Sequence, residues 1–349
     1  MRYSTNSENQ NVRLSYFRAF ACIGIVLLHT TFTSRMLYAD YISERQILVS
    51  DTICNMLMWC VPGFIMVTGI LLLNPERKVT LKKAVKKYAW RILKALLIFQ
   101  IVYKLIDTVL ANENITVGTF ASILENFITA GGTSLLWYLY MLIGMYLMIP
   151  FFKKIVDSSK DRELNIFMII MLAFLSVMPL SEIFGYKIGF YIPVYTVYPC
   201  YLFLGYMIYR KTFAISRMSG WILLLVNSAV IIGNSIYASN GSNLDLGSLW
   251  GYSSIFVVLQ SVGICELFVD SDRKLPDILN RVVLDFDKCS FGIYLIHIIF
   301  VKMILKNYGF NPYENGGFIA IVALVICITA ASYIITKALK LIPVVKNII

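Results

Sequence analysis

Residues 12–33 read VRLSYFRAFACIGIVLLHTTFT, a mainly apolar run that is interrupted by Arg18 and His29. A helix needs about 20 mainly apolar residues to cross a bilayer, so this run is long enough. Similar runs recur along all 349 residues, of which 58% are hydrophobic and 15% are charged. Soluble domains are about 25% charged. The chain is therefore predicted to be an integral membrane protein.

The apolar runs predict an all-α fold, a polytopic bundle of about ten transmembrane helices. The predicted spans are Val12–Thr33, Ile47–Leu73, Tyr88–Leu110, Leu135–Phe152, Ile166–Leu180, Pro193–Tyr209, Trp221–Tyr237, Ser253–Val269, Phe291–Leu305 and Phe318–Leu339. They form one membrane domain over residues 12–342, between a short N-terminal segment (1–11) and a short tail (343–349). No linker or internal repeat divides it.

Basic residues predict the orientation. The net charge is +11, and 24 of the 31 lysines and arginines fall in segments that are cytoplasmic if the N-terminus is inside. Five fall in outward segments, and Arg18 and Lys104 lie within spans. Positive charge favours the cytoplasmic side, so both termini are predicted to be cytoplasmic in a multi-pass protein of the cell membrane. The basic loops then face lipid headgroups, and nucleic acid is not an expected partner.

Familiar catalytic motifs are missing from the sequence. There is no GxSxG, Walker loop, HExxH or cluster of metal ligands, so no bound metal or cofactor is expected. The seven cysteines form no CxxC pair and lie mostly in apolar runs, which predicts buried free thiols. The first apolar run is too long for a signal peptide and is expected to remain in the mature protein.

Arg18 and His29 form the most informative pattern. A charged side chain within a span costs about 2.5–3.5 kcal/mol, so such residues are functional candidates. Eleven residues at about 100° each give about 1100°, which places both side chains on one face, about 16 Å apart along the axis. Arginine can hold a phosphate or carboxylate, and histidine can exchange a proton. The alternative without chemistry is that Arg18 reaches headgroups and His29 donates to a backbone carbonyl.

Other ionisable residues in spans have weaker patterns. Arg91 and Lys94 share one face at the cytoplasmic end of the third span, where they also fit ordinary topology signals. Tyr294 and His297 share a face of the ninth span and are candidates to line a site. Lys104 and Asp107 have the same spacing, and their simplest interpretation is a mutual ion pair.

Several motifs occur in the order that is known from one family. The run from Tyr16 to His29, with ten residues between Arg18 and His29, resembles the opening helix of the bacterial acyltransferase-3 membrane family. VPGFIMVTG at 61–69, RILK at 91–94, LWYL at 136–139 and SFGIYLIH at 290–297 are similar to its later signatures. Lys94 stands where the family pattern has a second arginine. The resemblance extends from about residue 12 to about residue 340.

The resemblance implies transfer of an acyl group, usually acetyl, from cytoplasmic acyl-CoA to a carbohydrate hydroxyl. Exopolysaccharide, capsule and lipid-linked or other cell-envelope glycans are the typical acceptors. By position, His29 is the expected catalytic residue, and Arg18, Arg91 and Lys94 are expected to bind the acyl donor. Acyl-CoA is then a co-substrate, and the lipid bilayer is the third partner.

Two alternatives belong to other functional classes. A transporter of a sugar intermediate or small solute would not depend on acyl-CoA, and the absence of inverted repeats speaks against it. A non-catalytic scaffold in a polysaccharide assembly complex would tolerate the loss of Arg18 and His29.

Overall fold

The computed structural model describes residues 6–130, 134–186, 188–192, 194, 196–212, 215–239, 249, 251–270 and 275–349. Pro193, where the sixth span was predicted to begin, lies outside the described residues. The same holds for residues 1–5 of the N-terminal segment and for Lys187, Arg273 and Lys274, which contributed to the predicted orientation.

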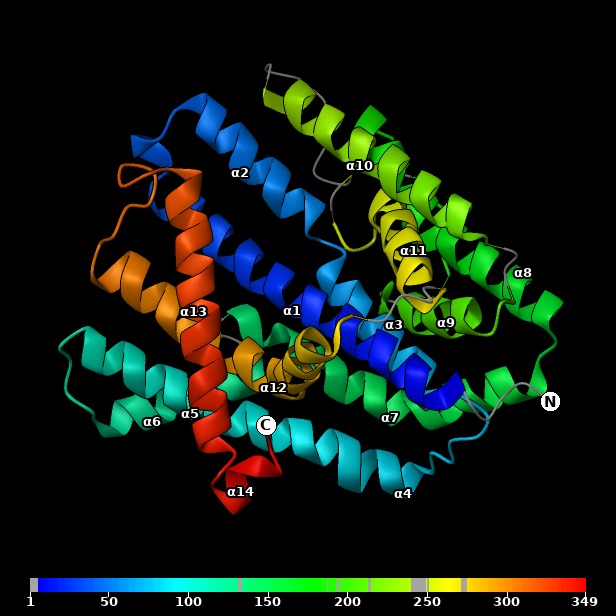
Figure 1. The fold of residues 1–349 in the computed structure, drawn as a ribbon, viewed down its shortest axis with the longest axis horizontal. Coiled ribbons are helices and arrows are strands. Elements are labelled where there is room, and N and C mark those ends of the chain that lie inside the picture. The colour runs from blue at the N-terminus through cyan, green and yellow to red at the C-terminus, as the bar shows by residue number, and fades with distance from the viewer. Residues whose placement is uncertain are drawn as a thin grey trace.

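The described part of the chain is helical and contains no strand (Figure 1). The helices are α1 (Asn6–Leu37), α2 (Glu44–Met56), α3 (Cys60–Leu72), α4 (Leu81–Lys83), α5 (Trp90–Leu110), α6 (Val117–Thr129), α7 (Trp137–Ser158), α8 (Asp161–Leu172), α9 (Tyr198–Tyr209), α10 (Arg217–Ser239), α11 (Ile255–Val269), α12 (Asp277–Lys302), α13 (Phe318–Leu339) and α14 (Pro343–Lys346). The all-α prediction is confirmed.

Seven helical stretches in the described chain are long and apolar enough to cross a membrane. They are Val12–Leu37, Glu44–Leu72, Trp137–Ser158, Asp161–Phe184, Arg217–Tyr237, Asp277–Asn307 and Phe318–Leu339. The other three predicted spans are also helical, but they are either more charged or shorter than the seven. Helix α5 carries four charged residues, and α9 and α11 have 12 and 15 residues. At 1.5 Å per residue, those two reach about 18 and 22 Å, less than the 30 Å core of a bilayer. Ten spans and cytoplasmic termini therefore stay predictions.

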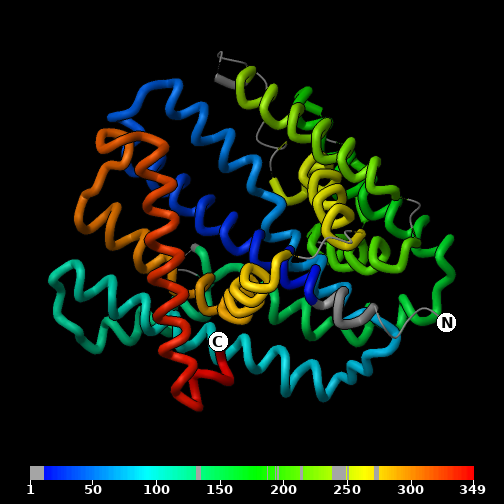
Figure 2. The backbone as a smooth tube through the Cα atoms, viewed as in Figure 1, coloured from blue at the N-terminus to red at the C-terminus, as the bar shows by residue number. Residues whose placement is uncertain are grey.

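Helix α1 lies in the middle of the molecule and packs against α2, α3, α11, α12 and α13 (Figures 1 and 2). Its central position follows from its sequence, because apolar residues occur on most of its faces and Phe17 and Val26 are fully buried. The hairpin of α5 and α6 lies at one end of the molecule, and α8 and α10 border another side (Figure 2).

Small residues allow α3 and α9 to approach closely. A Cβ atom on Gly69 would lie 1.9 Å from the carbonyl oxygen of Leu202, and one on Gly205 would lie 2.3 Å from that of Met66. Backbones meet this closely where glycine removes the side chain, as is common between membrane helices. All seven cysteines are free thiols and six are buried, as the sequence predicted.

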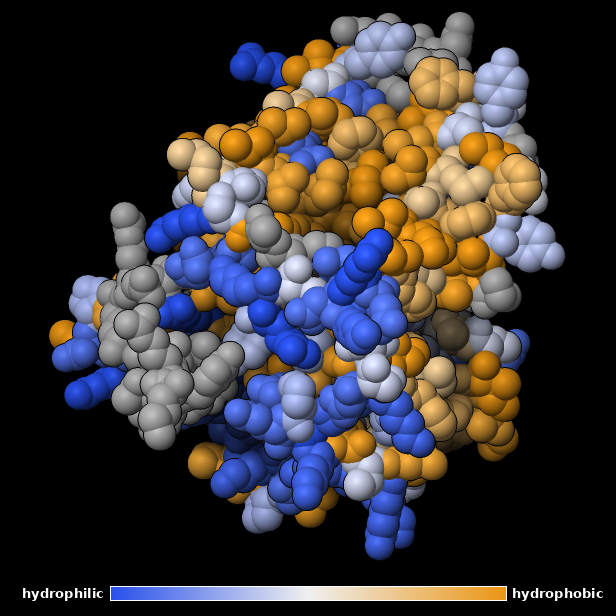
Figure 3. Space-filling view, turned by 90° about the vertical axis from the view of Figure 1, so that its right-hand side faces the viewer, coloured by the Kyte–Doolittle hydropathy of each residue, from blue (hydrophilic) through white to orange (hydrophobic). Residues whose placement is uncertain are grey.

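Polar and apolar side chains are separated on the surface. On the face that Figure 3 shows, hydrophilic residues gather in the centre and below, while hydrophobic residues cover the upper part. Many large apolar side chains are exposed, among them Phe20, Trp90, Ile169 and Ile326. A surface of this kind is expected where lipid replaces water as the solvent.

One prediction about charged residues was wrong. Asp107 pairs with Lys302 of α12 at 3.0 Å rather than with Lys104. The i, i+3 spacing places Lys104 and Asp107 on one face of α5, but it does not say which other helix lies opposite. Helix α12 begins at Asp277, so the charged residues that precede the predicted ninth span lie on the same helix as that span.

Candidate functional site

An ion pair joins α1 to α12. The Arg18 guanidinium donates from Nε to Asp287 Oδ1 at 2.8 Å and from Nη2 to Asp287 Oδ2 at 2.6 Å. The Asp287 side chain is only 6% exposed, and that of Arg18 is 28% exposed. Two parallel hydrogen bonds to one carboxylate hold the arginine in a defined plane. Arg18 is therefore fixed by a protein partner instead of reaching out to headgroups.

A pair of histidines also joins α1 to α12. His29 Nδ1 lies 2.8 Å from His297 Nε2, and the ring planes are inclined by only 10°. His297 Nδ1 lies 3.0 Å from the carbonyl oxygen of Ile293. His297 is fully buried, and His29 is half-buried. The two histidines of the sequence thus meet at one point.

The hydrogen bonds assign the protons of both rings. A carbonyl oxygen only accepts, so His297 carries its proton on Nδ1 and its Nε2 is an acceptor. His29 must then donate from Nδ1, which leaves its Nε2 unprotonated. Among the described residues, none forms a hydrogen bond with that nitrogen. His29 is consequently oriented as a base whose lone pair is available to a substrate.

The two contacts lie along parallel helices. Residue numbers rise in the same direction on both helices, from Arg18 to His29 on α1 and from Asp287 to His297 on α12. At 1.5 Å per residue these separations are about 16 Å and 15 Å, which match closely enough for both contacts to form together. The ion pair therefore sets the register in which the two histidines meet.

A cavity of about 350 Å³ adjoins the ion pair, and we call it the arginine cavity. Arg18, Arg77 and Arg91 line it, together with tyrosines and apolar residues. Its boundary includes Ile25 and Tyr294, each one helical turn before a histidine of the pair. The cavity thus extends from a group of three arginines toward the level of His29.

Two of these arginines have further contacts at the cavity wall. Arg91 is exposed, donates from Nε to the carbonyl oxygen of Ile348 at 3.1 Å, and places its guanidinium 5.6 Å from the centre of the Phe291 ring. Arg77 donates to the carbonyl oxygen of Leu71 at 3.3 Å. Neither is paired with a carboxylate among the described residues, so both keep their positive charge toward the cavity. An anion such as a phosphate is the ligand that this charge favours.

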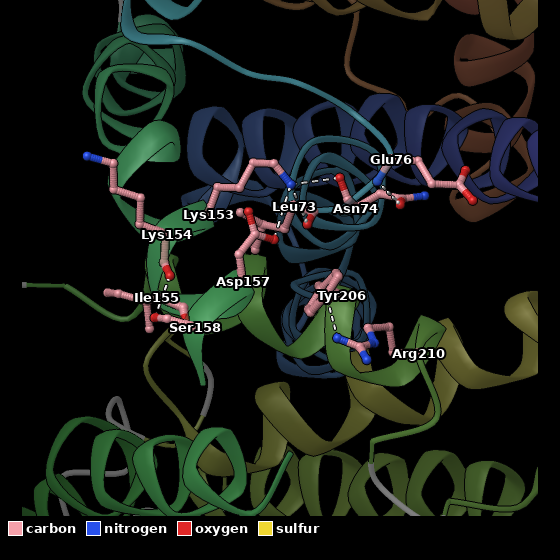
Figure 4. Close-up of polar contacts among 10 residues, drawn as sticks. All are labelled: Leu73, Asn74, Glu76, Lys153, Lys154, Ile155, Asp157, Ser158, Tyr206 and Arg210. Carbon is pink, nitrogen blue, oxygen red and sulfur yellow. Dashed lines mark hydrogen bonds and ion pairs between the residues drawn. The ribbon is translucent and has the colours of Figure 1, made fainter. Parts of the chain in front are cut away.

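A buried lysine holds the turn that carries Arg77. Lys153 of α7 points toward the end of α3, and its Nζ donates to the carbonyl oxygen of Asn74 at 2.9 Å and contacts Asp157 at 3.4 Å (Figure 4). The neighbouring Lys154 points away from this group. A cation at the last carbonyls of a helix satisfies acceptors that otherwise lack donors. Lys153 therefore stabilises the chain just before Arg77.

Tyr294 connects the cavity to the histidine pair. Its hydroxyl donates to the carbonyl oxygen of Leu135, and its ring centre lies 6.0 Å from that of His297. A tyrosine held at both ends forms a rigid part of the wall. Its position agrees with the prediction that Tyr294 and His297 share one face of the ninth span.

The predicted site residues are thus brought together in part. Arg18, Arg91 and Tyr294 line the arginine cavity, and His29 and His297 lie one turn beyond it. Lys94 is half-buried and is not among the lining residues.

Sequence reasoning missed two residues. Asp287 was not singled out, although it lies ten positions before His297 and so repeats the Arg18–His29 spacing of α1 almost unchanged. Arg77 was counted only as one of many basic residues that set the topology. Nothing in its local sequence separates it from its basic neighbours.

Comparison with known proteins gives one result. A family model that is described as an acyltransferase domain matches residues 11–337. No curated protein and no solved structure matches the chain. The matched range includes Arg18, His29, Asp287 and His297, and therefore both the ion pair and the histidine pair that join α1 to α12.

Proposed function

The chain belongs to the acyltransferase-3 family, and on that premise we propose that it is a multi-pass O-acetyltransferase of the cell membrane. It transfers the acetyl group of cytoplasmic acetyl-CoA to a hydroxyl group of a carbohydrate, such as exopolysaccharide, capsule or another envelope glycan. The observation that carries the proposal is the His29–His297 pair, whose hydrogen bonds leave Nε2 of His29 unprotonated, one helical turn beyond the lining of the arginine cavity.

The arginine cavity is the proposed site for the acyl donor. Coenzyme A carries a diphosphate and a further phosphate, and Arg77 and Arg91 offer charge that no carboxylate of the described residues neutralises. Arg18 keeps Nη1 for a ligand while Nε and Nη2 bind Asp287. With the phosphates at these arginines, the flexible arm of the donor would extend toward the level of Ile25 and Tyr294, and so toward His29.

The proposed reaction is general-base catalysis. His29 Nε2 accepts the proton of the acceptor hydroxyl while the hydroxyl oxygen attacks the thioester carbonyl carbon. The carbon–sulfur bond then breaks, the ester forms, and the thiolate of coenzyme A leaves and takes up the proton from His29 Nε2, which restores the free base. His297 Nε2 stabilises the imidazolium that forms on His29 by accepting a hydrogen bond from its Nδ1, and the Ile293 carbonyl holds His297 in the tautomer that can accept.

A second route uses the same nitrogen as a transient acyl carrier. His29 Nε2 attacks the thioester, the acetyl group moves from sulfur to nitrogen, and the acceptor hydroxyl then removes it as an ester. Trapping of labelled acetyl on the protein without an acceptor would distinguish this route from direct transfer.

The test is transfer from radiolabelled acetyl-CoA in membrane vesicles that contain candidate glycans. Wild type is compared with His29→Ala and with the matched control Thr30→Ala at equal protein levels. The Thr30 hydroxyl donates to the Val26 carbonyl within α1, so its loss reports only on the helix. We expect His29→Ala to lose about 10²- to 10⁴-fold of the rate and Thr30→Ala to retain it.

If His29→Ala retained normal acetylation, the proposed mechanism would be wrong. If folded wild-type protein transferred no acetyl group to any of the glycans, the assignment as an O-acetyltransferase that acts on carbohydrates would be wrong. Uptake of a small solute would then be measured.

A further inference from the structure

Helix α6 lies in a segment for which the sequence predicted no span, and it is too short to cross a bilayer. At 1.5 Å per residue its 13 residues reach about 20 Å, whereas a hydrocarbon core is about 30 Å thick. It packs beside α5, with which it forms a hairpin at one end of the molecule (Figures 1 and 2). The helix therefore lies in water, is covered by protein, or enters the membrane from one side.

The exposed side of α6 is an apolar stripe. Its members are Val117, Phe120, Leu124 and Ile128, which are between 57% and 87% exposed. At about 100° per residue they fall within about 80° of one another on the helix. Thr119, on the other side, is buried. An amphipathic helix that turns its apolar side outward is not stabilised by water, so the stripe needs an apolar partner.

The hairpin turns near one end of a long apolar helix. Asp107, in the last turn of α5, pairs with Lys302 of α12 at 3.0 Å. Lys302 lies five residues before the end of the stretch Asp277–Asn307, which is long and apolar enough to cross a membrane. Charged side chains are costly within hydrocarbon, so this pair belongs near a surface of the bilayer. The connection from α5 to α6 therefore lies near that surface.

From there α6 runs back along the bundle. Tyr140 of α7 donates to the carbonyl oxygen of Phe127, in the last turn of α6, at 2.8 Å. Six residues after α6 ends, the carbonyl oxygen of Leu135 accepts from Tyr294 of α12. Tyr294 lies eight residues, or about 12 Å, before Lys302 on the α12 axis. The end of α6 is thus deeper than its beginning, and the helix enters one leaflet obliquely.

Size and composition favour lipid over a protein partner. The stripe offers four side chains, whereas a stable protein interface takes about 20–30 residues from each partner. It contains no Trp, Tyr or Arg, the residues that dominate binding between proteins. The adjoining helix α5 also exposes apolar residues, namely Ile98, Ile101 and Val109. The surface of the hairpin is therefore of the kind that acyl chains cover.

Charge contributes little to this surface. Helix α6 contains no Lys or Arg and one acidic residue, Glu125. Glu125 is exposed and lies about 60° outside the stripe, so its carboxylate can reach headgroups and water while the stripe lies in hydrocarbon.

From these observations we infer that the apolar stripe of α6 docks into the hydrocarbon of the leaflet at the α5–α6 connection. Its partner is the acyl chains of the lipids rather than their headgroups. The strength of such docking scales with the buried apolar area, so anionic lipid is not required.

The experiment measures the surroundings of single positions in the full-length protein. Cys327 is the exposed one of the seven cysteines, so the background variant is Cys327→Ser. In this background Phe120→Cys, Leu124→Cys and Ile128→Cys are each labelled with bimane and reconstituted in phosphatidylcholine vesicles. Quenching by lipid with a nitroxide on its acyl chain is compared with quenching by iodide on both sides of the membrane.

Two further variants serve as controls. Glu125→Cys is the matched control, because it follows Leu124 directly and faces about 100° away. Glu314→Cys lies in the connection between α12 and α13, where Glu314 is exposed, and reports a position in water. Thermal unfolding of each labelled variant in detergent verifies that the protein is folded.

We expect nitroxide lipid to quench the three stripe positions at least about three-fold more than Glu314→Cys, and iodide to show the reverse order. Glu125→Cys should be more accessible to iodide than Leu124→Cys. Exchange of phosphatidylcholine for phosphatidylglycerol should change the quenching less than about two-fold, because α6 has no basic residue to bind headgroups.

Strong iodide quenching at Leu124→Cys and Ile128→Cys would overturn the inference, because the stripe would then lie in water. Protection of both positions from both quenchers would also overturn it, since a protein surface, such as a second copy of the chain, would cover the stripe. A requirement for phosphatidylglycerol would move the contact to headgroups and refute docking by acyl chains. Acetyl transfer is not measured, so these outcomes are independent of the proposed function.

Discussion

The two sides of α1 hold their neighbours by different means. Toward α12, contacts are directed, because Arg18 binds Asp287 through two hydrogen bonds and His29 binds His297 through one. Toward α3 and α11, ring stacking predominates: Phe17 lies between Trp59, just before α3, and Phe268 of α11, with ring centres 5.8 and 5.1 Å away. One hydrogen bond, from Arg13 Nη1 to the Val269 carbonyl at 2.9 Å, also joins α1 to the end of α11.

This difference has an energetic consequence. Removal of one partner of a buried ion pair is strongly destabilising, because the remaining partner is left with an unsatisfied charge. Apolar packing tolerates exchange of one hydrophobic group for another at modest cost. We therefore expect function to depend on the α12 side and stability to be shared by both sides.

The largest effect is expected at Asp287. Asp287→Ala leaves the Arg18 guanidinium without its carboxylate and should cost up to about 3–5 kcal/mol of stability. Acetyl transfer should fall about a hundred-fold or more, because the register of His29 and His297 is lost. Thermal unfolding in detergent and vesicle transfer measure the two effects.

Its matched control is Asp285→Ala, two residues away. Asp285 pairs with Lys337 at 2.7 Å and is 40% exposed, so its loss should cost no more than about 1 kcal/mol. The double variant Arg18→Ala/Asp287→Ala should be more stable than Asp287→Ala, since no unpaired charge remains. If the double variant were less stable, the buried-charge explanation would fail.

The next largest effect is expected at His297, which we propose as a positioning residue. His297→Gln removes the acceptor that assigns the proton of His29 and should lower kcat about 10- to 100-fold. KM for acetyl-CoA should stay within about two-fold, because His297 does not line the arginine cavity. The measurement is a full kinetic comparison at several pH values, where a shifted pH profile is expected. A pure rise in KM would contradict the positioning role.

A smaller and different effect is expected at the arginine cavity. Arg77→Gln and Arg91→Gln should each raise KM for acetyl-CoA about ten-fold or more with little change in kcat, since each removes a hydrogen bond to a phosphate. Lys94→Gln is the matched comparison on the same helix as Arg91, and it should have the weaker effect. If Lys94→Gln raised KM for acetyl-CoA as much as Arg91→Gln does, the acyl donor would extend beyond the arginine cavity.

The smallest effect is expected on the apolar side. Phe17→Leu keeps a buried apolar side chain and removes two ring contacts, which should cost about 1–2 kcal/mol. Transfer per folded protein should stay within about two-fold. Thermal unfolding together with vesicle transfer checks both values, and a loss as large as that of Asp287→Ala would remove the contrast between the two sides.

Much of the site was visible as a pattern along single helices. The spacing of Arg18 and His29 predicted a shared face, and Tyr294 and His297 were predicted to share another. Both follow from the regular rise and turn of a helix, which depend on local sequence alone. The partner of Asp107 was predicted wrongly for the complementary reason, because local spacing does not reveal which helix packs opposite.

The sequence by itself determined that the chain is helical, apolar enough for lipid, and equipped with ionisable residues that membrane helices otherwise avoid. Only the tertiary structure decided that Asp287 binds Arg18, that His297 orients His29, and that Arg77 joins the arginine cavity. Periodicity places a side chain on a face of its own helix, whereas its partner depends on the packing of helices far apart in the sequence. The α1–α12 contacts join residues separated by almost 270 positions, a distance over which no local pattern operates.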